Sequence, residues 1–219
     1  MVTTSVFRNW KLRCAISAEV LSMNDSSIYE QTLGPSFTAL APVLKRLHGT
    51  GVRRLSGDLC LSAGPHPLVR PLLWLAGLPR TQAAAACELC LVPNHQGEYW
   101  QRYFGRWKFI TRQRSALSNM ANAGAQGRAT GREILERFGP FTVHLHLQVK
   151  GQSLWVRSRS TSLFGIAVPA ALAIKVVACE RPIDEHSFYC DIQIRLPWLG
   201  RLLRYRGALR FQPLSRSVR

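Results

Sequence analysis

The chain has 219 residues, of which 47% are hydrophobic, so it can bury one well-formed core and is short for two. Its formal net charge at pH 7 is +17, from 29 basic and 12 acidic residues, and 24 of the basic residues are arginine. Six cysteines are too few for a disulfide-dense scaffold, and the longest apolar run, residues 67–78, is interrupted by Arg70 and Pro71 and too short to cross a bilayer. Residues 1–22 lack the apolar segment and cleavage site of a secretory signal, so we expect a reduced, cytoplasmic protein.

The excess of positive charge has two interpretations. An arginine-rich surface attracts nucleic acid or anionic lipid through long-range electrostatics. However, the chain holds no run of five or six consecutive basic residues, and the arginines after residue 200 are spaced out rather than grouped. The sequence therefore favours charge spread over solvated strand faces, with binding to an acidic surface as the alternative.

Helical spacing is found in two regions. Between residues 28 and 48, apolar side chains recur at steps of three and four, and Pro35 and Pro42 break the region into short helices. Residues 66–78 predict a short helix that is apolar nearly all round. Such a helix must be covered by other elements or close an opening.

The rest of the chain predicts strands joined by tight turns. The clearest pattern is at residues 141–149, where apolar and polar residues alternate and then pair back after a turn at 150–153. Residues 115–131, rich in Ala, Asn and Gly, predict a loop. The expected strands cover residues 52–62, 80–93, 97–104, 107–113, 141–150, 154–156, 174–181, 188–196 and 202–211. Because a sheet of about nine to ten strands curls, we predict an α+β fold: a strongly curved antiparallel sheet or partial barrel with short covering helices.

Residues 97–113 hold the densest aromatic and cationic chemistry in the chain. A hairpin that folds back at Gly105 and Arg106 places two sets of alternate residues on one face. These sets are Glu98, Trp100, Arg102 and Phe104, opposite Gln113, Thr111, Phe109 and Trp107. We interpret this face as the wall of a ligand pocket, in which Arg102 binds the acidic head of a mostly apolar ligand and Gln113 adds a donor or acceptor. The alternative is a core strand in which Glu98 and Arg102 each bond to a neighbouring strand. The predicted ligand-binding residues are Glu98, Trp100, Arg102, Phe104, Trp107, Phe109 and Gln113.

Catalytic, metal and cofactor signatures are weak in this sequence. Cys87 and Cys90 have CxxC spacing, but in a strand this spacing sends the two sulfurs to opposite faces. His144 and His146 share a strand face whose predicted neighbour is rich in arginine, which does not complete a metal site. The carboxylates are scattered, and neither a GxSxG, a P-loop nor a dinucleotide motif is present. We therefore predict no catalytic residue, no metal and no cofactor.

Several short motifs together resemble a known family. In chain order they are LGPSF, LKRLHG, WLAGLP, WQRYFG, LERFGPF, FGIAVP and LPWLGRLLRYRGAL, spread over residues 29–210. This set resembles the bacterial domain of unknown function designated DUF4166, which is sometimes fused behind a saccharopine-dehydrogenase-like reductase. The resemblance implies one structural unit and a reductase as an expected partner, and it supplies no catalytic residues. The 115–131 loop is longer than the resemblance leads us to expect.

These observations lead to one domain and a binding function. We expect a poorly structured extension at residues 1–27, a single domain at 28–212 and a tail at 213–219. The leading hypothesis is a non-catalytic module that binds a small apolar, amphipathic or acidic ligand in a curved-sheet cavity, as lipocalin-like and START-like carriers do. The alternatives are a basic adaptor that binds nucleic acid or anionic membrane, and an accessory domain that acts with a reductase.

Overall fold

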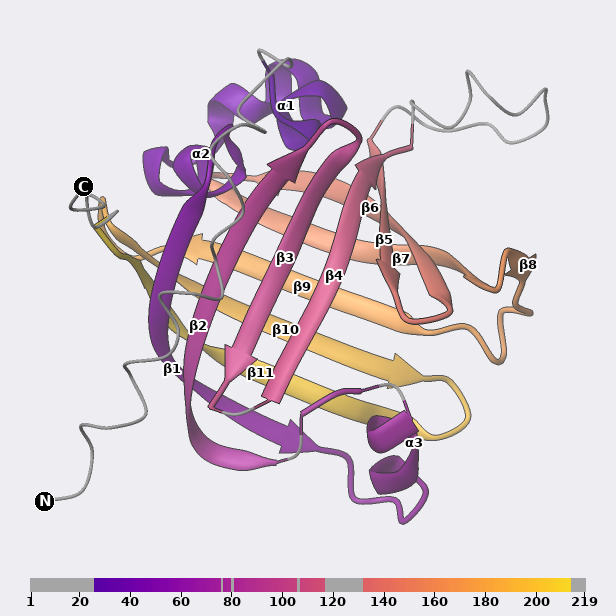
Figure 1. Ribbon diagram of the computed structural model, residues 1–219. Coiled ribbons are helices and arrows are strands. Elements are labelled where there is room, and N and C mark those ends of the chain that lie inside the picture. Colours follow the sequence, from indigo (N-terminus) through magenta and orange to yellow (C-terminus); the bar gives the residue numbers. More distant parts are fainter. Residues whose placement is uncertain (1–25, 76, 80, 106, 117–131, 214–219) are drawn as a thin grey trace, which may run out of the picture.

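The computed structural model describes residues 26–75, 77–79, 81–105, 107–116 and 132–213, and its main feature is a closed antiparallel barrel (Figure 1). Its strands are β1 (Arg53–Ala63), β2 (Gln82–Asn94), β3 (Gly97–Phe104), β4 (Trp107–Ser115), β5 (Glu133–Phe138), β6 (Phe141–Lys150), β7 (Ser153–Leu163), β8 (Ile166–Ala167), β9 (Lys175–Pro182), β10 (Ser187–Leu196) and β11 (Gly200–Phe211). Ten strands form the ring in chain order, with β7 beside β9 and β11 paired back to β1. The two-residue β8 is added to the end of β7. The fold is therefore an up-and-down barrel.

The predicted sheet is confirmed as a strongly curved antiparallel sheet, and the structure closes it into a full ring. Closure depends on the β1–β11 pair, in which Leu55 lies opposite Phe211. Two glycines allow the close approach of these strands. A Cβ at Gly57 would lie 2.0 Å from the carbonyl oxygen of Ala208, and one at Gly207, where φ is +158°, would lie 2.4 Å from that of Asp58. Any larger residue at either position must push the two strands apart.

Strand β5 was not predicted from the sequence. Its inward positions carry Ile134, Glu136 and Phe138, which face the inward Val143 and Leu145 of β6. A carboxylate at the middle inward position interrupts the apolar alternation by which a strand is recognised. The loop predicted before it lies mostly at residues 117–131, outside the described residues.

The predicted short helices are present, and they lie at both ends of the barrel. At one end, α1 (Ile28–Leu33), η3 (Gly34–Ala39) and α2 (Pro42–His48) form a helical cap, with proline at the start of η3 and of α2. At the other end, α3 (Val69–Leu75) follows β1 and packs Val69 and Leu73 inward. None of the helices built from the described residues has the length and apolar character needed to span a bilayer.

Candidate functional site

The β3–β4 hairpin has the predicted register. The inward pairs are Glu98 with Gln113, Trp100 with Thr111, Arg102 with Phe109 and Phe104 with Trp107. Trp107 is half-buried, and the other predicted ligand-binding residues are all buried. The hairpin thus contributes an aromatic wall that carries an acid, a guanidinium and an amide to the barrel interior. Their role in binding a ligand stays a prediction.

Glu98 is held by two partners inside the barrel. One carboxylate oxygen accepts from Arg53, at the start of β1, and the other accepts from Trp100 Nε1 at 2.7 Å. Arg53 also donates to the carbonyl of Gly49, just after α2. Glu98 and Arg53 are both buried, at 4% and 6% exposed. Glu98 therefore ties β3 to β1, which lies beyond β2 in the ring, and through Arg53 to the end of the helical cap; its partner is on another strand, but not on the neighbouring strand of the alternative.

Arg102 lies deeper in the barrel with its guanidinium between two rings. The carbon at its centre is 5.0 Å from the Trp100 ring centroid and 5.6 Å from that of Phe109. Nη1 donates to Thr111 Oγ1 at 3.0 Å, whereas Nη2 is 3.7 Å from Glu136 Oε1, too long for a hydrogen bond. Burial alone lowers the pKa of Arg102, but the electrostatic effect of nearby acidic groups, Tyr205 and Glu136 foremost, outweighs burial and raises it. A permanently charged group with five donors thus faces the interior with a single short contact among the described residues.

The helical cap contributes polar side chains to the same interior. His48, 1% exposed at the end of α2, forms a 2.5 Å contact between Nε2 and Glu180 Oε2 of β9. The ring centroids of Tyr29, in α1, and His48 are 3.9 Å apart. The Tyr29 hydroxyl donates to Gln113 Oε1 at 2.8 Å. Burial, with the charges of Glu98 and Glu180, raises the pKa of Tyr29. The cap is thus fixed to β4 and β9 through buried polar contacts.

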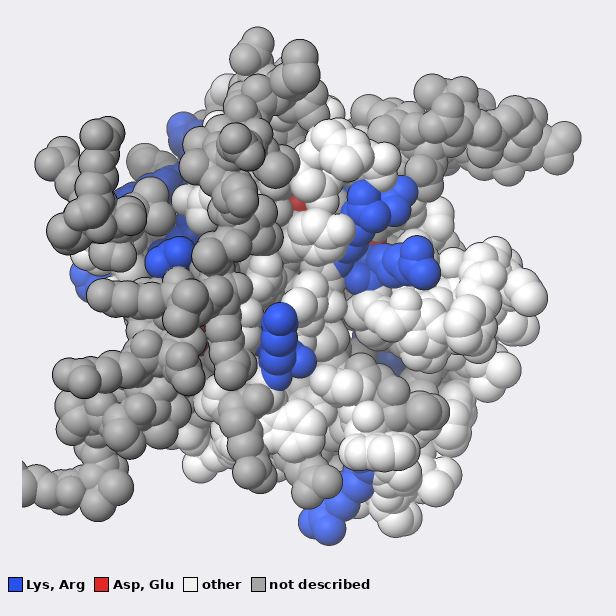
Figure 2. Space-filling model, viewed as in Figure 1, with Lys and Arg blue, Asp and Glu red and all other residues white. Residues whose placement is uncertain are grey.

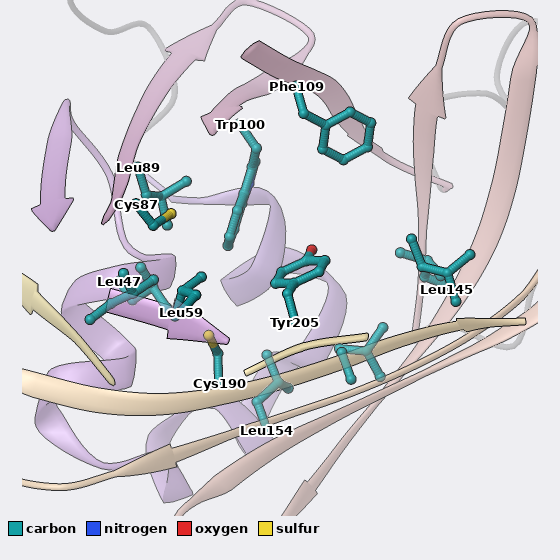
Figure 3. Packing of buried hydrophobic residues seen from close by; sticks show 14 of the residues in the cluster. Leu47, Leu59, Cys87, Leu89, Trp100, Phe109, Leu145, Leu154, Cys190 and Tyr205 are labelled. Carbon is teal, nitrogen blue, oxygen red and sulfur yellow. The ribbon is translucent and has the colours of Figure 1, made fainter. Parts of the chain in front are cut away.

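Several of these side chains line a cavity of about 70 Å³ inside the barrel. A single water needs roughly 10–15 Å³, and small-molecule pockets usually measure roughly 300–1,000 Å³. The polar lining residues are Tyr29, Arg102, Gln113, Glu136, Glu180 and Tyr205, and most of the other lining residues are apolar, with Leu59, Leu89, Leu145, Val156 and Leu209 among them. Figure 3 shows Tyr205, Trp100 and the thiols of Cys87 and Cys190 among the side chains of this interior. The cavity therefore has room for only a few heavy atoms, and polar and apolar side chains both line it.

Of the predicted ligand-binding residues, Trp100, Arg102 and Gln113 line the cavity. Glu98, Phe104 and Phe109 pack around it, and Phe104 meets Tyr205 edge to face, with 5.8 Å between the ring centroids. Sequence reasoning missed several of the interior polar groups. They are Tyr29, His48, Arg53, Glu136, Glu180 and Tyr205. Glu136 and Glu180 did carry a signal, because each is an acid at an inward position of a strand.

The structure also shows where the CxxC cysteines and the two histidines of residues 141–150 lie. Cys87 lines the cavity, whereas Cys90 pairs with the outward-facing Gln101, so the two thiols lie on opposite faces of β2 as predicted. His144 and His146 lie on the outward face of β6, and burial together with Arg159 lowers the pKa of His146. Over the part of the chain that the structure describes, no three metal-ligating side chains come together.

Burial predicts unequal reactivity of the cysteines toward iodoacetamide. Burial raises the pKa of Cys87 to about 12 and that of Cys190 above its ordinary range, so both stay protonated thiols at pH values near 8. Cys60 is exposed. We expect Cys60 to be alkylated first among these three, as peptide mass spectrometry of the folded protein would show. In a Cys60→Ser variant the Cys87 and Cys190 peptides should still be alkylated slowly, and Cys87→Ser should leave the fast alkylation of Cys60 unchanged. Equal rates at Cys60 and Cys87 would contradict a closed interior.

Comparisons with known proteins give a family and no activity. The family model described as "Domain of unknown function (DUF4166)" matches residues 40–209. No curated protein matches the chain. Among solved structures, the chain is similar at 10% identity to an inactive mutant of the CurJ dehydratase in complex with Compound 21. That similarity covers 86% of this chain and 85% of the other, with a TM-score of 0.19, which does not establish a common fold.

Proposed function

The chain belongs to the DUF4166 family, whose description assigns no activity, and from the barrel interior we propose that it is a non-catalytic module that binds a small amphipathic molecule. One observation carries this proposal: the buried Arg102 guanidinium lines a cavity whose other lining residues are mostly apolar. A ligand oxygen would accept hydrogen bonds from Arg102, and the apolar part of the ligand would contact the aliphatic lining residues. This pairing of few polar groups with a largely apolar lining is typical of small-molecule sites.

The geometry around Arg102 favours a ligand oxygen as its partner. Thr111 is its one short contact among the described residues, and the 3.7 Å gap to Glu136 leaves that pair without a direct hydrogen bond. Hydrogen bonds from a charged donor in a buried site are stronger than those between neutral groups. The Trp100 and Phe109 rings hold the guanidinium in place, so little side-chain entropy remains to be lost on binding.

The charges of the lining restrict the head group. Glu136 and Glu180 line the cavity together with Arg102, so a ligand carboxylate meets one cation and two acids. A neutral carbonyl accepts from Arg102 without that repulsion. A carboxylic acid and its methyl ester, both with a short chain suited to the small cavity, therefore form a matched pair of probes.

Replacing Arg102 by methionine should weaken binding of the better probe by about 10- to 100-fold, because hydrogen bonds to a charged group are lost. Isothermal titration calorimetry with propanoic acid and methyl propanoate measures this change. The matched control is Arg204→Met, which removes the same charge from a residue that is paired with Asp191 on the outer surface. It should leave affinity unchanged, and thermal unfolding checks that both variants fold.

The two probes separate the possible head groups. Tighter binding of the ester indicates a neutral carbonyl, and tighter binding of the acid indicates that Glu136 turns away from Arg102. The proposal fails if the wild-type protein binds neither probe, or if a folded Arg102→Met variant binds both as well as the wild type does.

A further inference from the structure

The end of the barrel opposite the helical cap carries a concentration of exposed apolar side chains. Strands β1, β7 and β10 are parallel to one another in the ring, so the connections that follow them emerge at the same end. Within the described part of the chain nine large hydrophobic residues are exposed, and six of them lie in these three connections. They are Leu68, Trp74, Phe164, Ile166, Leu172 and Trp198, with Phe164 the most exposed at 80%. We call this set the apolar rim.

Phe164 adopts a conformation that is unfavourable for its residue type. It has φ +51° and is followed by Gly165 at +84°, so the two residues form the turn between Leu163 of β7 and Ile166 of β8. Asn or Gly is usual where a two-residue turn requires left-handed backbone, because a Cβ is crowded there. The Phe164 ring is exposed, so packing within the chain does not offset this cost. Contact of the ring with an apolar phase outside the protein would offset it.

The charges around the apolar rim are of one sign. In the sequence, the segments that connect strands at this end, 64–81, 105–106, 139–140, 164–174 and 197–199, contain neither Asp nor Glu. Arg70 in α3 and Lys108 and Arg195 near the strand ends are exposed, and Lys175 and Arg201 are half-buried beside them. Figure 2 shows the area around α3 as mainly uncharged, with basic atoms at its lower margin. An apolar surface edged by basic residues complements a negatively charged bilayer surface.

We propose that the apolar rim docks on an anionic lipid bilayer, with Trp74, Phe164 and Trp198 inserted at the interface and the neighbouring basic residues contacting lipid phosphates. The apolar tips project from three separate connections rather than forming one groove. A fluid interface accommodates such separate tips, and tryptophan favours the headgroup region. Single-stranded nucleic acid stacks on aromatic rings, but it gives no role to Leu68, Ile166 and Leu172.

This inference does not rest on the proposed ligand function. None of the six residues of the apolar rim lines the cavity. Vesicle binding and small-molecule binding are therefore tested by different variants. Arg102→Met should leave vesicle binding unchanged, and changes in the apolar rim should leave cavity binding unchanged.

Vesicle co-sedimentation tests the proposal with the full chain. Vesicles of phosphatidylcholine and phosphatidylserine should bind the protein, and vesicles of phosphatidylcholine alone should bind it less. A variant with Trp74→Ser, Phe164→Asn and Trp198→Ser should lose at least about tenfold in partition coefficient. Asparagine suits the left-handed position of Phe164, so that substitution should not impair folding.

The matched control is Ile183→Ser, which removes an apolar side chain of 54% exposure at the capped end of the barrel. It should bind vesicles as the wild type does. If the triple variant binds as well as the wild type, or if Ile183→Ser loses as much, the proposal is wrong. Tighter binding to a single-stranded oligonucleotide than to anionic vesicles would also overturn it in favour of nucleic acid.

Discussion

Replacing Glu98 by alanine is expected to lower the free energy of unfolding by about 3–5 kcal/mol, because it leaves the buried Arg53 without its charged partner. The side chains of both residues are 5% exposed, and Glu98 also accepts from Trp100, so β1 and β3 lose their shared contact and the Trp100 indole loses its acceptor. Urea unfolding monitored by circular dichroism measures the loss. The same experiment on Asp191→Ala, which breaks the partly exposed pair with Arg204, should show a loss below about 1 kcal/mol.

A double variant separates pairing from packing at this position. Arg53→Met combined with Glu98→Leu removes both charges and keeps apolar volume, so it should cost less than Glu98→Ala alone. The contrary result would be a double variant whose free energy of unfolding falls by as much as the sum of the losses in the two single variants. In that case the shape of these side chains, rather than the buried charge, would hold the cap to the barrel.

Replacing Gly57 by alanine is expected to cost about 3 kcal/mol, the upper part of the range for overpacked interiors. The new Cβ would lie 2.0 Å from a backbone oxygen of β11, and a backbone has no alternative rotamer by which to move away. The strands must separate at the pair that closes the ring. Thermal unfolding detects the loss.

Gly151→Ala provides the comparison for Gly57. Gly151 has φ +58° with nothing within 4 Å of its Cβ position, so alanine there meets backbone strain without a clash. Its cost should be about 1 kcal/mol. Equal losses at the two positions would show that backbone conformation, and not the closeness of β1 and β11, determines the effect at Gly57.

Much of the fold could be predicted because alternation in sequence reports which face of a strand is buried. The β3–β4 register followed from a two-residue turn at Gly105 and from side chains that alternate strictly on either side of it. Full closure did not follow from local pattern. It depends on contact between β1 and β11, which are far apart in sequence and whose fit is set by two glycines.

The site was predicted less completely for a related physical reason. The hairpin pointed to Trp100, Arg102 and Gln113, all of which line the cavity. Their partners come from α1, β5 and β11, and a single sequence does not show which distant residues meet inside a barrel. His48 and Glu180 are 132 positions apart. Each looks like an ordinary polar residue until the helical cap is placed over β9.

Ring closure between β1 and β11 also affects how the barrel is made during synthesis. Leu55 pairs with Phe211, so the edge of β1 that pairs with β11 stays without a partner until Phe211, 156 positions later, is translated. At typical rates of 5–20 residues per second this takes roughly 8–30 s. An unpaired strand edge is a template for intermolecular pairing, so a ribosome stalled before β11 would leave an aggregation-prone chain. Chaperone contact with nascent β1 would protect it during that interval.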